Sequence, residues 1–242
     1  MTHADSLTAA LMTVISAADP GRHFRFSIRR PDGGRSGSRP SRHGLKSLKR
    51  LEHDVGYLQF DGLTGNREAL EAVTRRLVAL PDVKALVVDI RENIGGSGDM
   101  VSLLCSHLLE RATLLYRVCG RSGGPGEVGS TVCERLFPRE ILVYVLTGRA
   151  TVSAAEAFAY IQKDLKRATI VGERAAGLGN PSRTWSIEED FTLTVPFLRI
   201  RYGSSGGEFG GVGVIPDSEV RADQALSVAL AEIEKRFRAD RR

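Results

Sequence analysis

The chain has 242 residues, of which 42% are hydrophobic, an ordinary share for a globular protein, and its formal charge is +5. No apolar run reaches the roughly 18 residues that a helix needs to cross a bilayer, which excludes a membrane-spanning helix. The three cysteines stand 14 residues apart and lack C-x-x-C spacing, which argues against a disulfide framework and against a zinc site.

The N-terminal segment, residues 1–18, predicts an amphipathic helix with Leu7, Leu11 and Ile15 on one face. No Lys or Arg precedes its apolar stretch, so it lacks the basic region of a secretory signal. Together with cysteines that are expected to stay reduced, this favours a cytoplasmic protein. We expect residues 1–20 to form a short N-terminal helix and residues 21–242 to form one core domain.

Residues 22–50 hold ten Lys or Arg against a single acid, Asp32. Glycines and prolines interrupt residues 31–50, which predicts a flexible basic loop. Attraction to acidic substrates or to nucleic acid is one interpretation of this charge. A solvated loop is the interpretation we favour, because residues 31–50 lack the interleaved aromatic side chains on which bases stack. We therefore do not expect a nucleic-acid partner.

Strand-like and helix-like segments alternate along the rest of the chain. Strands are predicted at residues 24–28, 55–60, 85–90, 114–118, 141–146, 168–172 and, more weakly, 191–198; helices are predicted at residues 66–80, 99–109, 153–165 and 222–237. This order indicates right-handed β–α–β units and an α/β domain with a mainly parallel sheet.

The segment from Thr151 to Glu156 joins an apolar strand-like run to a helix-like one. A serine at such a turn lies beside free backbone N–H groups and the positive end of the helix dipole. Those groups can hold an oxyanion, so Ser153 suits acyl transfer. Ser153 and Glu156 also match the S-x-x-E capping box, in which the hydroxyl only caps the helix, and the motif alone leaves this alternative open.

Five segments, taken in order, resemble the C-terminal-processing (tail-specific) serine peptidase family. The similar branch is the one that contains tricorn core protease and interphotoreceptor retinoid-binding protein. The matching segments are residues 55–61, 85–96, 151–156, 170–177 and 211–217. The resemblance implies a ClpP/crotonase-like β-α superhelix core in a single domain, and no PDZ domain precedes this core.

The resemblance further implies that Ser153 is the nucleophile. The oxyanion hole would be formed by backbone N–H groups of the Gly95-Gly96 turn and of Ala154. Glycines let a backbone approach a substrate closely, and two convergent donors stabilise a tetrahedral intermediate by several kcal/mol. On sequence alone, Gly95 and Gly96 also fit an ordinary tight turn.

The general base departs from the pattern of the PDZ-bearing members. Leu178 stands where those members have a catalytic lysine, and a leucine side chain cannot take a proton. Tricorn-like members use a histidine from the N-terminal side, and His23 matches that position. A neutral imidazole suits a general base near pH 7. In those members a carboxylate assists the histidine, but the corresponding residue in this chain is Gly210. Glu208 could take its place only if the loop is remodelled.

The resemblance therefore predicts a serine-type peptidase that acts on a peptide or protein substrate, without a cofactor or a metal. One alternative is a catalytically weak protein that binds an apolar ligand such as a retinoid or a fatty acid. A second is a peptide acyl transferase or cyclase, in which an amine replaces water as the acceptor. A homo-oligomer is left open, and no membrane partner is expected.

Overall fold

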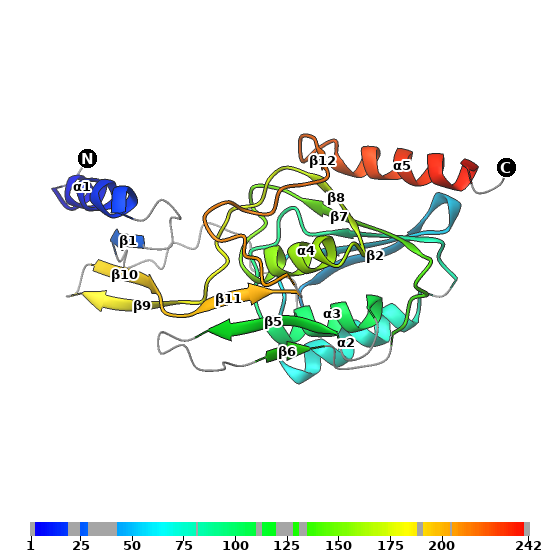
Figure 1. Cartoon of the computed structure of the whole chain (residues 1–242), viewed down its shortest axis with the longest axis horizontal. Helices are drawn as coiled ribbons and strands as arrows, with labels where there is room; N and C mark the ends of the chain where they lie inside the picture. The colour runs from blue at the N-terminus through cyan, green and yellow to red at the C-terminus, as the bar shows by residue number, and fades with distance from the viewer. Residues whose placement is uncertain are drawn as a thin grey trace.

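The computed structural model describes residues 3–18, 25–28, 43–80, 82–109, 113–119, 128–130, 135–187, 191–203 and 205–239. Its centre is a six-stranded sheet in the order β12-β8-β7-β4-β3-β2 (Figure 1). The strands are β2 (Leu45–Leu51), β3 (Val55–Phe60), β4 (Ala85–Asp89), β7 (Leu142–Thr147), β8 (Thr169–Gly172) and β12 (Ser218–Glu219). All neighbours pair in parallel except β2, which runs antiparallel to β3.

Helices cover both faces of this sheet, as the continuous apolar runs of the parallel strands require. The helices α2 (Arg67–Val78), α3 (Gly98–Leu108) and α4 (Ala154–Asp164) pack on the face that carries Leu86 and Val88. The helix α5 (Ala225–Ala239) packs on the opposite face, which carries Ala85 and Val87. Successive side chains of β4 thus point to opposite faces of the sheet, and the core is divided into two layers.

Two small antiparallel sheets flank the central one. The first has the order β11-β5-β6, from β11 (Arg199–Tyr202), β5 (Leu114–Cys119) and β6 (Val128–Ser130). The second has the order β1-β10-β9, from β1 (Arg25–Ile28), β10 (Phe191–Pro196) and β9 (Ser182–Ile187). The helix α1 (His3–Ala18) lies beside this second sheet at one end of the molecule, and α5 lies at the other end (Figure 1).

The predicted α/β class and mainly parallel sheet are confirmed. The basic segment differs from the expected flexible loop, because Leu45–Leu51 forms β2 and pairs with β3; residues 29–42 lie outside the described part. The leucines of L-K-S-L-K-R-L recur every third residue, so the segment lacks the apolar–polar alternation that would predict a strand. It forms a strand because it pairs with β3. No helix in the described ranges is both long and apolar enough to cross a bilayer.

Candidate active site

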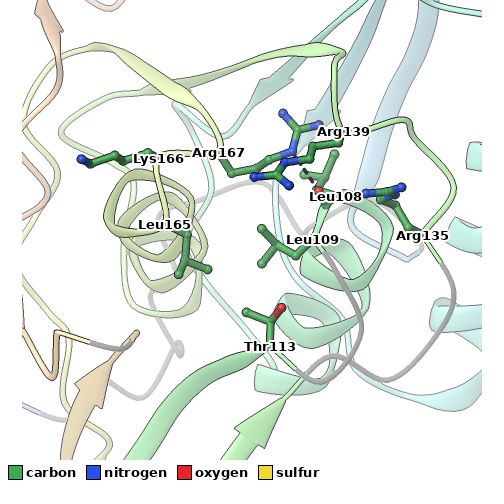
Figure 2. Close-up of a pocket in the computed structure, with 8 residues that line it drawn as sticks. All are labelled: Leu108, Leu109, Thr113, Arg135, Arg139, Leu165, Lys166 and Arg167. Carbon is green, nitrogen blue, oxygen red and sulfur yellow. Dashed lines mark hydrogen bonds between the residues drawn. The ribbon is translucent and has the colours of Figure 1, made fainter.

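Hollows lie at both ends of α4. One, of about 290 Å³, lies at the C-terminal end and is lined by arginines and leucines (Figure 2). The other, of about 500 Å³, lies at the N-terminal end, and Ser153 and Ala154 form part of its wall. The second hollow is the candidate active site, because it contains a serine at a strand-to-helix turn.

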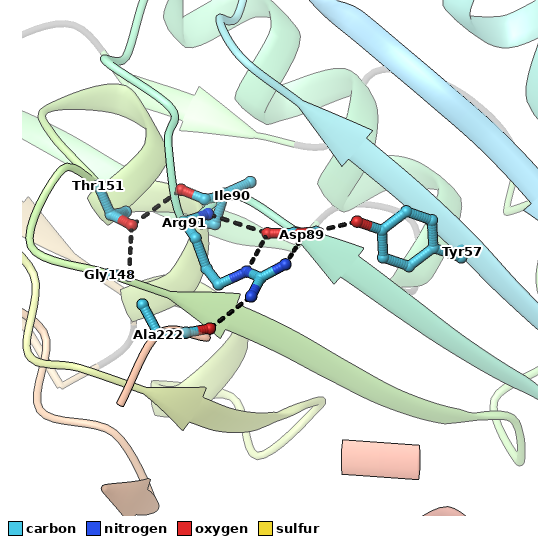
Figure 3. A network of polar contacts seen from close by, with 7 residues as sticks. All are labelled: Tyr57, Asp89, Ile90, Arg91, Gly148, Thr151 and Ala222. Carbon is cyan, nitrogen blue, oxygen red and sulfur yellow. Dashed lines mark hydrogen bonds and ion pairs between the residues drawn. The ribbon is translucent and has the colours of Figure 1, made fainter. Parts of the chain in front are cut away.

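Two turns at the carboxyl ends of β4 and β7 build this site. Thr151 fixes them together: its hydroxyl donates to the Ile90 carbonyl at 2.8 Å and accepts from the Gly148 N–H at 2.9 Å (Figure 3). The Val152 N–H donates to the Asn93 carbonyl at 3.0 Å. Neighbouring parallel strands end at one edge of a sheet, which is why residues 93–96 and 148–153 meet there.

Ser153 has an unusual backbone for the residue before a helix, with φ 57° and ψ −119°. Asn66 and Ser97, which precede α2 and α3, have the ordinary extended conformation, and each side chain caps its helix through a backbone N–H. A positive φ at a non-glycine residue is strained, and strained strand-to-helix turns present the nucleophilic serine in α/β-hydrolases. The Ser153 side chain is exposed, so a substrate can reach it.

The Gly95-Gly96 turn lies directly against Ser153. A Cβ atom on Gly95 would be 2.9 Å from the Ser153 Cβ and 3.2 Å from the Ala154 nitrogen, so only glycine fits. The Gly95 N–H already donates to Asn93 Oδ1 at 2.9 Å. The N–H groups of Gly96 and Ala154 have no hydrogen-bond partner in the described part of the chain. These two donors are therefore available to an oxyanion. The role of Gly95 is to leave room for the Ser153 turn, because it has no side chain.

Glu156 joins the Ser153 turn to the loop at residues 177–178. Its buried carboxylate accepts the N–H groups of Ser153 at 3.0 Å, Gly177 at 2.6 Å and Leu178 at 2.9 Å. Burial raises the pKa of Glu156, and the three N–H donors act against that rise. The S-x-x-E motif predicted the first of these bonds; the other two depend on the loop at 177–178, which is remote in sequence.

The wall of the candidate active site carries no Asp, Glu, Lys or Arg among its described residues. The larger apolar side chains that line it are Val101, Tyr116, Val118, Phe197, Leu198, Ile200 and Tyr202. Behind Tyr202 lies Phe209, with ring centroids 5.0 Å apart. The sequence analysis did not identify this wall, because β5, β11 and the residues around Phe197 meet only through pairing of remote strands.

A buried ionic network supports the end of β4 next to the site (Figure 3). The Tyr57 hydroxyl donates to Asp89 at 2.6 Å, and the Arg91 guanidinium donates to the same carboxylate at 2.7 and 2.9 Å. Arg91 also donates to the Ala222 carbonyl, just before α5. Burial and the bonded Asp89 raise the pKa of Tyr57, which keeps its proton on the hydroxyl.

The predicted general base, His23, lies outside the described residues. Leu178, at the position of the family's lysine, is an exposed loop residue whose N–H donates to Glu156. Glu208 pairs with Arg199 at 2.7 Å and with Arg201 at 3.5 Å. Side chains alternate along β11, so these arginines lie on the opposite face from Ile200 and Tyr202.

Two arginines bind the carboxylate of Glu208 in this structure, and its catalytic role stays a prediction. Gly210, at the family's carboxylate position, offers no side chain in its place. Within the ranges that the structure describes, no cluster of three or more His, Cys, Asp or Glu side chains could hold a metal ion.

Many solved structures have a similar fold, and they include the three that follow. A candidate peptidase from Parabacteroides merdae has a TM-score of 0.71 at 18% identity, over 96% of this chain and 83% of that one. The photosystem II D1 C-terminal processing protease has a TM-score of 0.58 at 22% identity; the match covers 84% of this chain, which spans about half (49%) of that protein. The tricorn protease has a TM-score of 0.50 at 17% identity, over 76% of this chain and 18% of that one.

These likenesses establish the fold, since all three identities are low. The resemblance to interphotoreceptor retinoid-binding protein stays a prediction. The family is established by sequence, because the profile of peptidase family S41 matches residues 54–220, more than half of the chain and all of the Ser153 site's turns. The chain therefore belongs to peptidase family S41.

Proposed function

We propose that this chain is a serine peptidase in which Ser153 is the nucleophile. The observation that carries the proposal is the backbone of Ser153, φ 57° and ψ −119°, at a turn where only glycine fits opposite it. A serine that merely capped α4 would need only the extended conformation of Asn66 or Ser97. The strained turn instead presents the hydroxyl next to two unpaired N–H donors.

In this mechanism the Ser153 oxygen attacks the scissile carbonyl carbon while a general base takes its proton. The N–H groups of Gly96 and Ala154 donate to the oxyanion that forms. The carbon–nitrogen bond then breaks, and the proton passes to the departing amine. Water hydrolyses the acyl-enzyme and restores the serine. Glu156 holds the turn in place.

The apolar wall of the pocket supports a preference for substrates with an apolar residue at the scissile position. Val101, Ile200 and Tyr202 offer contact area but no charged partner. A charged substrate side chain would lose its hydration there without compensation. Peptides with Leu or Phe at this position should therefore be cleaved faster than peptides with Asp or Lys.

The Ser153→Ala variant tests the nucleophile. We expect it to lose peptide cleavage and fluorophosphonate labelling while its circular dichroism spectrum and thermal transition stay those of the wild type. Ser227→Ala is the matched control, because Ser227 is also an exposed serine at a helix but lies on α5. Labelling that persists in Ser153→Ala would refute the assignment.

His23 is proposed as the general base from the family resemblance. The His23→Ala variant should cleave at least about 100-fold more slowly than the wild type, since removal of a general base costs roughly that much. His53→Ala, at an exposed position between β2 and β3, is the control. A wild-type rate in His23→Ala would exclude this histidine as the base.

The uncharged pocket also favours one alternative, binding of an apolar ligand such as a fatty acid or a retinoid. Titration of the purified protein with retinol and fatty acids, run beside fluorophosphonate labelling, separates the two functions. Saturable binding of retinol or a fatty acid, without any fluorophosphonate labelling, would favour the ligand-binding function. Product mass distinguishes hydrolysis from acyl transfer to an amine. A cytoplasmic location stays a prediction, and the oligomeric state stays open.

A further inference from the structure

The β1-β10-β9 sheet, which lies at the α1 end of the molecule (Figure 1), has two chemically different faces. One face carries hydroxyl groups: Thr192 bonds Ser27 and Thr194 bonds Thr184, each with 2.8 Å between the oxygens. Because side chains alternate along a strand, the residues between these lie on the other face. Its described apolar side chains, which we call the apolar sheet face, are those of Phe26, Trp185, Ile187, Phe191, Leu193 and Val195.

The apolar sheet face is open to solvent. None of its six residues is buried, and on β9 the side chains of Trp185 and Ile187 are 45% and 39% exposed. The helix α1 meets the opposite edge of the sheet, where the Phe26 N–H donates to Met12 Sδ at 3.0 Å. The apolar face of a sheet normally packs against another layer, and an exposed apolar patch marks a binding surface. This face therefore needs a partner.

The apolar sheet face continues into the Ser153 pocket. Just beyond the last pair of β9 and β10, the Phe197 N–H donates to the Pro181 carbonyl at 3.1 Å, and both residues line the pocket. The Arg183 guanidinium lies over the Phe197 ring, 4.6 Å from its centroid. Since Arg183 is paired with Val195, the Phe197 ring lies on the same side of the sheet as Val195. One apolar surface thus runs from the pocket wall along β10.

We infer that the apolar sheet face docks an extended segment of a polypeptide substrate whose scissile residue lies in the Ser153 pocket. The inference rests on the proposed peptidase function and names its substrate class: a chain with apolar residues at alternate positions on one side of the scissile bond. The strands β9 and β10 have six residues each, so they are about 20 Å long and match about six residues of an extended substrate.

The continuity of the two surfaces favours a substrate over a second copy of this chain. A second copy would cover the sheet without entering the pocket, so it would not explain why one apolar surface joins them. A substrate segment with apolar side chains would remove Trp185 and Ile187 from water as it binds, whereas a polar segment would gain nothing there.

Binding can be measured without catalysis, because Trp185 is the only tryptophan of the chain. The Ser153→Ala variant would be titrated with peptides that share one Leu-containing core and carry six further residues before or after it. In one set these residues alternate Val with Gln, and in the other they alternate Ser with Gln. One of the Val peptides should shift the Trp185 emission saturably to shorter wavelength, and its Ser counterpart should not. No saturable shift with either Val peptide would overturn the inference.

Cleavage kinetics give a second readout. In Trp185→Thr/Ile187→Thr, the KM for the Val peptide that binds should rise at least about tenfold while kcat stays that of the wild type. The core peptide alone should be cleaved as before. Threonine keeps a high strand propensity and both positions are exposed, so the fold should survive. Val14→Thr/Val78→Thr is the matched control, because it changes two exposed apolar residues outside the sheet.

The outcomes separate this inference from the proposed function. A saturable shift in a protein that cleaves no peptide would refute the peptidase and leave the docking surface. Cleavage with equal KM for the Val and Ser peptides would leave the peptidase and overturn the docking surface. A dimer in sedimentation velocity that Trp185→Thr/Ile187→Thr abolishes would assign the face to a second copy, which would also overturn the inference.

Discussion

Gly95 has no room for a side chain, and this makes it a sharp test of the Ser153 turn. Its φ is +93°, and an added Cβ would lie 2.7 Å from the Val152 carbonyl oxygen and 2.9 Å from the Ser153 Cβ. Gly95→Ala should therefore displace the serine, reduce the rate of fluorophosphonate labelling at least tenfold and cost about 1–3 kcal/mol of stability.

Gly206→Ala is the control for backbone strain alone. Gly206 also has a positive φ, +66°, but a Cβ there would meet nothing within 4 Å. The free energy of unfolding of that variant should fall by about 1 kcal/mol, and its rate of fluorophosphonate labelling should stay that of the wild type. Equal labelling rates in the two variants would show that Ser153 reacts normally despite a side chain at position 95, which would contradict the proposed geometry.

Glu156 gives a pH-dependent prediction at the same turn. Its folded pKa is raised above 4.5 by burial, so the folded protein keeps a proton that the unfolded chain releases. The free energy of unfolding should consequently fall as the pH rises from 4.5 through the raised folded pKa. Glu156→Gln does not titrate, so the wild type should lose stability relative to this variant over that window in urea titrations.

The opposite trend would mean that the N–H donors of Ser153, Gly177 and Leu178 outweigh burial and hold the folded pKa below that of the unfolded chain.

At the scale of elements, the Asp89–Arg91 network connects β4 to α5. Removing the Arg91 side chain leaves the carboxylate of Asp89, which is 1% exposed, without its charged partner and frees the Ala222 carbonyl. Loss of one partner of a buried pair costs about 3–5 kcal/mol, so Arg91→Ala should be strongly destabilised in chemical denaturation. Amide hydrogen exchange in α5 should accelerate in the same variant.

The control is Arg221→Ala, which breaks an exposed pair with Asp223 close to the same helix. Water screens an exposed pair, so this variant should unfold almost as the wild type does. Equal losses in the two variants would show that Arg91 contributes no more than a surface pair.

The elements that the sequence predicted well are those whose burial is one-sided or complete. Continuous apolar runs identified β4 and β7, because both faces of these strands are covered. The strands β9 and β11 were missed. Every residue of β9 is exposed, so no apolar alternation marks it, and only its pairing with β10 makes it a strand. The intrinsic strand propensity of a segment does not reveal a strand whose stability depends on pairing with another strand.

At the scale of the whole molecule, the candidate site depends on segments that are far apart in sequence. Ser153, Gly96 and Ala154 could be predicted because they lie at turns between regular elements, where spacing and motif order carry information. The pocket wall could not, because Tyr116 and Tyr202 come from strands outside the central sheet and Phe197 comes from the connection between β10 and β11. The chemistry of this chain is therefore more predictable than its selectivity, since selectivity is set by tertiary packing.

Cys105 reports on the integrity of this packing. It is fully buried on α3, its sulfur accepts from Gln162 Nε2 of α4 at 3.3 Å, and burial raises its pKa to about 12. Because only an exposed thiolate reacts, its alkylation at pH 8 should require unfolding of the core. In a Cys119→Ser/Cys133→Ser background, the labelling rate should rise with urea along the slope of global unfolding. A rate independent of urea would mean that α3 and α4 separate locally, and then the two ends of α4 would not be held by one cooperative core.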